Sequence, residues 1–267
     1  MKSTPQAIDP QAQPAQRPDW QVVGWMGYRL EIPAAWNLSS YYGGMKSGEV
    51  YFSDLVGRCL HLAWQSPPPK RLAPTAQTIQ AQWQEQGWEF SALGDKQLAR
   101  HKDQTRVLWV GPKRIVTLEW LLKSDWVPEI TATLQEEYEA PQWLWQIYGI
   151  AGMVPREIGL ERADFIPGGS SLSMTDGWTR LWLGSISLAQ QRIGHDTAGA
   201  WASTQVLAKG LRKLPWSGAG KHWRVAQTMG WPLLPWGQRQ TGILRHDPEA
   251  NVLRWSLLNR WQWLRNK

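Results

Sequence analysis

Cysteine and phenylalanine are scarce in this chain, which has one cysteine, Cys59, and three phenylalanines among 267 residues. A single cysteine excludes an intramolecular disulfide and a cysteine-rich metal site. Long apolar runs are missing too, because no stretch approaches the ~18 residues of a membrane-spanning helix. The first residues are polar and lack the apolar core of a signal peptide. These absences predict a cytoplasmic protein with no membrane span.

Residues at the spacing of a catalytic or metal site are also missing. The five histidines are His61, His101, His195, His222 and His246. None lies four residues from another or joins Cys or Glu at a ligand spacing, so we expect no metal site. The sequence has no Gly-x-Ser-x-Gly motif, which in hydrolases exposes a nucleophilic serine at a sharp turn. The sequence therefore predicts no catalytic residues, no cofactor and no enzymatic activity.

One acidic run, Glu136-Glu137-Tyr138-Glu139, could in principle hold a metal ion. We expect this run to be helical, in which case its carboxylates fan around the helix axis instead of converging. The run is therefore predicted to be a solvated face.

Tryptophan is abundant, with 21 residues in 267. With so few phenylalanines, we expect many tryptophans to occupy the core. Trp109, Trp120, Trp182 and Trp255 fall in predicted strands and could pack inward. Because the indole N–H needs a hydrogen-bond partner, tryptophan is rarely buried completely, and some of these rings should be partly exposed.

Basic residues are concentrated in the second half of the chain. The total net charge is +7, but residues 150–267 hold 15 basic and 7 acidic residues, a net charge of +8. Residues 1–149 carry 14 basic and 15 acidic residues, a net charge of −1. This asymmetry is compatible with an anionic partner and equally with ordinary solvating charge.

Changes in composition divide the chain into four segments. Residues 1–18 are rich in proline and polar residues and are predicted to be a disordered tail. Residues 19–127 alternate as strands around one helical stretch, in the order β-β-β-α-β-β-β. Residues 128–149 begin with Pro128, and because proline suits the first position of a helix, we expect a helical connector there. Residues 150–267 repeat the order of the first unit.

Matched residues support this interpretation as an internal repeat. Ser53-Asp54 with Arg58 resembles Thr175-Asp176 with Arg180, and Gln104-Thr105 resembles Gln240-Thr241. The predicted fold is α/β, of the α+β type, with two tandem pseudo-repeats. Each repeat is expected to pack an antiparallel sheet against a helix, because the apolar face of such a sheet must be covered.

The stretch Gly27-Tyr28-Arg29-Leu30-Glu31-Ile32-Pro33-Ala34-Ala35-Trp36 resembles the opening of the PsbP-like family, which has a similar Pro-x-x-Trp turn. The resemblance covers residues 20–125, and the second unit would be a divergent repeat. It implies an α/β/α sandwich that serves as a binding or docking module. It assigns no site residues.

Tryptophan and arginine alternate near two predicted strand ends and give the candidate binding residues. Trp231 and Trp236 flank a proline-bounded loop between strands, and the C-terminal segment adds further aromatic and basic side chains. The candidate residues are Trp231, Trp236, Arg254, Arg260, Trp261, Trp263 and Arg265. Such rings suit a protein interface, stacking on bases or contact with a membrane interface or other anionic surface, but they could equally fix the C-terminal segment to the body.

The sequence thus predicts a non-enzymatic interaction or scaffold protein that binds a protein partner through an aromatic-rich surface. The alternative is binding of nucleic acid or another polyanion through the basic C-terminal unit.

Overall fold

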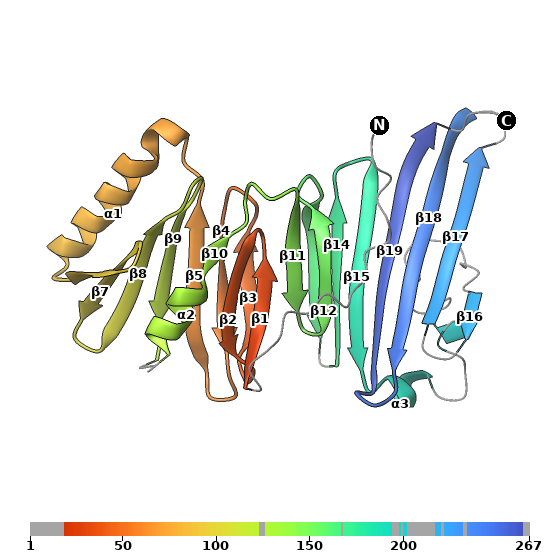
Figure 1. The fold of residues 1–267 in the computed structure, drawn as a ribbon, viewed down its shortest axis with the longest axis horizontal. Coiled ribbons are helices and arrows are strands. Elements are labelled where there is room, and N and C mark those ends of the chain that lie inside the picture. The colour runs from red at the N-terminus through yellow and green to blue at the C-terminus, as the bar shows by residue number, and fades with distance from the viewer. Residues whose placement is uncertain are drawn as a thin grey trace. The chain divides into compact units, whose positions relative to one another are not determined.

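The computed structural model describes residues 19–122, 126–166, 168–193, 198, 200–201, 217–219, 222–231 and 234–263 (Figure 1). The tail expected at residues 1–18 lies outside the described residues. The described chain forms two compact units, of which the first ends at Ile147 and the second begins at Tyr148.

Seven antiparallel strands form the large sheet of the first unit, in the order β3-β4-β5-β9-β8-β7-β6. The strands are β3 (Asn37–Gly43), β4 (Ser47–Ser53), β5 (Arg58–Gln65), β6 (Glu89–Leu93), β7 (Lys96–His101), β8 (Gln104–Val110) and β9 (Ile115–Trp120). Alternation of apolar and polar residues gives the sheet two different faces. Leu60, Leu62 and Trp64 of β5 are buried on one face, whereas His61 and Ala63 point to the other and are partly exposed.

Helix α1 (Leu72–Glu85) follows a short 3₁₀ turn, η1 (Pro69–Arg71). It confirms the helix that the sequence predicts from Thr75 to Trp88, although it begins and ends three residues earlier. It packs over β8 and β9, where Ala76 meets Leu108 and Ile115 (Figure 1). Ala76 is the helix's one fully buried residue, so α1 covers a small part of the sheet. Helix α1 does not cover the rest of the face that carries His61.

A second, smaller layer covers the apolar face of the large sheet. It contains β1 (Trp20–Trp25), β2 (Tyr28–Pro33), β10 (Gln135–Glu136) and β11 (Gln142–Ile147), hydrogen-bonded in the order β10-β2-β1-β11, with helix α2 (Val127–Thr133) beside them. Tyr28 of β2 lies 5.6 Å from Trp64 of β5, ring centroid to ring centroid. Gly24 of β1 is required because a methyl group there would overlap the carbonyl oxygen of Leu144. The core of the unit is therefore a sheet packed on a sheet.

The expected α/β class, with a helix packed on each sheet, is wrong. The described part of the chain is mostly β-structure, about 60% strand and 16% helix, and its strands form three antiparallel sheets. The physical reason lies in the first unit, where a second sheet buries the apolar face that we assigned to a helix. The helical connector is likewise corrected, because α2 ends at Thr133 and Gln142–Ile147 is strand β11.

The second unit contains another seven-stranded antiparallel sheet, in the order β13-β14-β15-β19-β18-β17-β16. Its described elements are β12 (Ile150–Pro155), β13 (Gly159–Ile166), β14 (Gly169–Thr175), β15 (Thr179–Ser187), α3 (Ala189–Ile193), β16 (Ser217–Ala219), β17 (His222–Trp231), β18 (Leu234–Asp247) and β19 (Val252–Trp263). If the seven strands of each large sheet are counted along the chain, they are arranged in the same order in both sheets.

Equivalent turns in the two sheets use the same hydrogen bonds. The Asp54 carboxylate accepts from the backbone N–H groups of Val56 and Gly57, at 2.7 and 2.9 Å. The Asp176 carboxylate accepts in the same way from Trp178 and Thr179, at 2.8 and 2.6 Å. Each aspartate thus fixes the turn between the second and third strands of its sheet.

A buried arginine joins the two layers of the first unit. Arg114 is fully buried in the turn between β8 and β9, and its Nη1 donates to the Met26 carbonyl at 2.6 Å. Its Nε lies 3.7 Å from Oε1 of Glu136, whose side chain is 1% exposed. Three aromatic rings surround the guanidinium, at 4.3 Å from the ring centroid of Tyr138, 4.9 Å from Tyr28 and 5.6 Å from Trp143.

This geometry corrects the solvated acidic run expected at residues 136–139. Glu136 belongs to strand β10 and is buried against Arg114, although Glu139 is exposed, as expected of a solvated carboxylate. Burial raises the pKa of Glu136, and the charge of Arg114 opposes that rise.

Replacing Arg114 with methionine should lower the free energy of unfolding by about 3–5 kcal/mol, because Glu136 would remain buried without its counterion. Urea denaturation of the full chain, followed by tryptophan fluorescence, measures this loss. The neighbouring exposed pair Lys113–Glu139 supplies the control, and Lys113→Met should cost less than about 1 kcal/mol. The double variant Arg114→Met/Glu136→Met should regain much of the stability. An Arg114→Met chain within 1 kcal/mol of the original would contradict the account.

Candidate functional site

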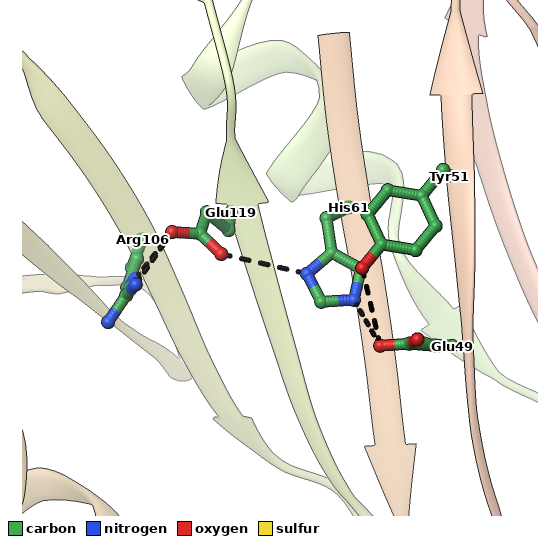
Figure 2. Close-up of polar contacts among 5 residues, drawn as sticks. All are labelled: Glu49, Tyr51, His61, Arg106 and Glu119. Carbon is green, nitrogen blue, oxygen red and sulfur yellow. Dashed lines mark hydrogen bonds and ion pairs between the residues drawn. The ribbon is translucent and has the colours of Figure 1, made fainter. Parts of the chain in front are cut away.

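A row of polar side chains crosses four neighbouring strands on the face of the large sheet that α1 partly covers. Tyr51 of β4 lies opposite His61 of β5, His61 lies opposite Glu119 of β9, and Glu119 lies opposite Arg106 of β8. Glu49, two residues before Tyr51, projects from the same face (Figure 2). Residues that are far apart in sequence therefore form one continuous surface.

His61 lies between two carboxylates. Its Nε2 is 2.9 Å from Oε2 of Glu49, and its Nδ1 is 3.6 Å from Oε2 of Glu119 (Figure 2). Arg106 approaches Glu119 from the far side, with Nη2 2.6 Å and Nε 3.0 Å from Oε1. Both nitrogens of the imidazole ring are directed at carboxylate oxygens, which fixes the ring in the row.

The surroundings of Glu119 keep it negatively charged. Its interaction with His61, reinforced by Arg106, lowers its pKa from 4.5 to about 2 against the opposing effect of burial. Tyr51 changes in the other direction, because partial burial and the charge of Glu49 raise its pKa. At neutral pH the row thus holds Glu119 as a carboxylate and Tyr51 as a phenol.

Aromatic rings and guanidinium groups extend the row on both sides. The Tyr51 ring stacks on His61 with centroids 4.3 Å apart, and Arg58 covers Tyr51 at 4.3 Å from its centroid. At the other end, Arg106 lies 4.5 Å from the ring of Trp88 and 5.3 Å from that of Trp83. We call these residues, from Arg58 through Tyr51, His61, Glu49, Glu119 and Arg106 to Trp88 and Trp83, the aromatic–charged face.

A shallow cleft of about 420 Å³ adjoins this face. Tyr42 of the outermost strand, β3, and Glu49 belong to its lining, as do Ala63 and Gln65 of β5 and Thr117 of β9. Tyr42 is 58% exposed. The volume is within the range of small-ligand sites, but the cleft is open and lies on a sheet surface instead of inside the fold.

The arrangement does not suit a metal ion. Glu49 and Glu119 approach opposite nitrogens of the same ring, so the three side chains cannot converge on one point. Among the described residues, no group of three or more His, Cys, Asp or Glu side chains is placed to hold a metal. Cys59 does not suit the role of a nucleophile, because it is buried and burial raises the pKa of its thiol.

Positions that correspond to the row in the second unit are not ionisable. Equating Gln104-Thr105 with Gln240-Thr241 places Gly242 at the position of Arg106. Across the neighbouring strands, Gly242 lies opposite Leu257, Leu257 lies opposite Trp182, and Trp182 lies opposite Ser173. The charged row is therefore a feature of the first unit, although the two sheets have the same strand order.

The sequence-predicted binding residues lie on β17, β18 and β19 of the second unit. β17 ends at Trp231, and Trp236 of β18 lies opposite Trp263 of β19. Of Trp231, Trp236, Trp261 and Trp263 the structure describes only the backbone, and Arg265 lies outside the described residues.

Both remaining candidate arginines belong to β19. Arg254 is half-buried, and its Nε donates to the Gly149 carbonyl at 2.9 Å. Arg260 is exposed and lies opposite Thr179 and Arg239 in the two neighbouring strands.

Among the strand tryptophans, Trp109 and Trp120 are buried, as their positions predicted. Trp182 and Trp255 are partly exposed. The aromatic–charged face was missed, although its members alternate with apolar residues along β4, β5, β8 and β9. The alternation could have indicated which residues share a face, but their proximity depends on strand register.

No protein family, curated protein or solved structure matches the chain. The PsbP-like resemblance therefore stays a prediction. Among the described residues, no helix has both the length and the apolar character needed to cross a membrane.

Replacing Glu119 with glutamine tests the electrostatics of the row. Because folding lowers the pKa of Glu119, its stabilisation is complete above pH 4.5 and is lost as the pH falls toward about 2. At pH 7 the variant should lose about 1.5–3 kcal/mol of unfolding free energy, the range for hydrogen bonds to a charged group. Chemical denaturation at several pH values should show the difference from the unmodified protein shrinking below pH 4.5.

The exposed Glu85, at the end of α1, provides the matched control, since Glu85→Gln should change stability little at any pH. A difference for Glu119→Gln that stays constant from pH 7 to pH 2.5 would rule out the proposed charge interaction.

Proposed function

We propose that this protein is a non-enzymatic interaction protein that binds a protein partner through the aromatic–charged face of its first unit. The observation that carries the proposal is the cross-strand row itself, in which side chains of opposite charge and aromatic rings are held in one fixed pattern. Tyrosine, tryptophan and arginine are the residues that most often dominate the energy of protein interfaces, and this face contains all three.

The fixed contacts favour recognition over catalysis. A general base needs a free nitrogen or oxygen near its substrate, but both ring nitrogens of His61 are directed at carboxylates. Glu119, with a pKa of about 2, is a poor proton donor or acceptor near neutral pH. A pre-ordered set of charges also lowers the entropic cost of binding, which is a benefit to an interface.

The neighbouring cleft and strand β3 extend the proposed interface. β3 is the outermost strand of its sheet in the described part of the chain, and outer strands can pair with an extended segment of a partner. Tyr42, exposed on β3, would then contact the partner beside the cleft. We propose that the partner contributes such an extended segment.

We also propose that the two units arose by duplication. The identical strand order and the matched Asp54 and Asp176 turns support this. The charged row would then have been acquired, or retained, by the first unit alone, as expected when one copy is specialised for binding.

Photo-crosslinking tests the proposed interface. We expect p-benzoylphenylalanine at Tyr42 to capture one discrete protein in cells, whereas the same residue at Trp178, an equally exposed aromatic position in the second unit, should not. The captured protein is then purified and its affinity for the full chain is measured by calorimetry. Tyr51→Ala should weaken binding by at least about tenfold, the effect of losing a modest interface hot spot.

Trp178→Ala is the matched control and should change the affinity less than twofold. Thermal unfolding of both variants checks that the fold is retained. Equal affinities for Tyr51→Ala and the unmodified chain would show that the aromatic–charged face is not the binding site.

A further inference from the structure

Two exposed arginines of the second unit face one another without a counter-charge. Arg239 of β18 and Arg260 of β19 are directly opposite in the register of their strands, and both are exposed. Side chains opposite one another in an antiparallel pair have their Cβ atoms about 4.5–5.5 Å apart, where two like charges are destabilising. Neither arginine forms an ion pair with another residue in the described part of the chain.

Hydroxyl-bearing residues extend the same row of the sheet. Arg260 lies opposite Thr179 of β15, and Arg239 lies opposite Thr228 of β17. The row across four strands is therefore Thr228, Arg239, Arg260 and Thr179. Two neighbouring guanidinium groups suit a phosphate group, since arginine binds phosphate oxygens in a bidentate manner.

A second pair of opposed arginines lies further along the same two strands. Arg245 is opposite Arg254, six residues along each strand from the first pair. Residues separated by an even number along a strand share a face, so the two pairs lie on one face about 20 Å apart. This second pair is less accessible than the first, because Nε and Nη1 of Arg245 are buried and the Nε of Arg254 donates to the Gly149 carbonyl.

We propose that Arg239 and Arg260 form a binding site for the phosphates of a single-stranded nucleic acid, independently of the protein interface in the first unit. The two exposed guanidinium groups without a counter-charge attract an anion. The surplus of positive charge in residues 150–267 favours a polymer with repeated phosphates over one free phosphate. Arg239 and Arg260 lie on interior strands of the sheet and not on a projecting loop, which favours a flexible strand over a flat lipid surface.

The surplus of positive charge in residues 150–267, with 15 basic and 7 acidic residues, would strengthen the attraction at long range.

The test uses the full chain and a fluorescently labelled 20-nucleotide oligo(dT), with binding followed by anisotropy at several salt concentrations. Arg239→Gln/Arg260→Gln should weaken binding at least tenfold at low salt. Loss of two phosphate contacts should also flatten the slope of log K against log salt concentration by about 1.4, at about 0.7 for each contact with a single strand.

A charge-matched control separates a specific site from net charge. Arg156→Gln/Arg180→Gln removes the same two charges from the same unit, at exposed arginines that pair with Glu157 and Glu161. This control should keep most of the affinity and the original salt slope. Inorganic pyrophosphate should compete with the oligonucleotide for the unmodified protein.

Three results would overturn the proposal. One is the absence of binding to the oligonucleotide at low salt, and another is an equal loss in the two double variants. The third is a preference for vesicles of phosphatidylcholine and phosphatidylserine over the oligonucleotide that Arg239→Gln/Arg260→Gln abolishes. The phosphate site would then belong to a lipid surface.

The unfolding temperature of the Arg239→Gln/Arg260→Gln chain should not fall, since the substitution relieves the repulsion between the two arginines. A marked fall would show that the pair is structural.

Discussion

The buried guanidinium of Arg114 is the constraint on which the first unit depends. A charge removed from water needs compensation, and Arg114 obtains it from a hydrogen bond to the Met26 carbonyl, from the ion pair with Glu136 and from three aromatic rings. These partners come from β2 and the turn before it, from β10 and the turn after it, and from β11, whereas Arg114 itself lies between β8 and β9. The position of the small layer on the large sheet is thereby specified by one side chain, and an alternative packing would leave a charge uncompensated.

The two faces of the large sheet acquire their different roles from this packing. Because the small layer covers the face of Leu60, Leu62 and Trp64, the face of His61 needs no further cover beyond α1. Polar residues can therefore collect there, where they pair with one another and remain accessible. The aromatic–charged face is rigid because strand register, and not a flexible loop, places its side chains.

Parts of this fold could be predicted from sequence. Strands such as β2, β4, β5, β8 and β9 and the landmarks shared by the two halves follow from local periodicity and turn chemistry, as does the helix expected from Thr75 to Trp88 and found at Leu72–Glu85. The expected order β-β-β-α-β-β-β was incomplete, because β1, β3, β7 and β11 were not expected. The class was wrong because a sequence pattern shows that a sheet has an apolar face but not what covers it. The segment after Thr133 was wrong for a similar reason, since the preference of Glu136-Glu137-Tyr138-Glu139 for a helix is overridden by the pairing of Glu136 with Arg114. The row of Tyr51, His61, Glu119 and Arg106 joins residues up to 68 positions apart, and only strand register brings them together.

The central claim is that the aromatic–charged face recognises a protein partner, and amide hydrogen exchange tests it most directly. Exchange would be measured on the full chain with and without the partner captured at Tyr42. The account predicts slower exchange in β3, β4 and β5 on binding, with little change in β13 and β14 of the second unit. Protection confined to the second unit, with β3 to β5 unchanged, would contradict it.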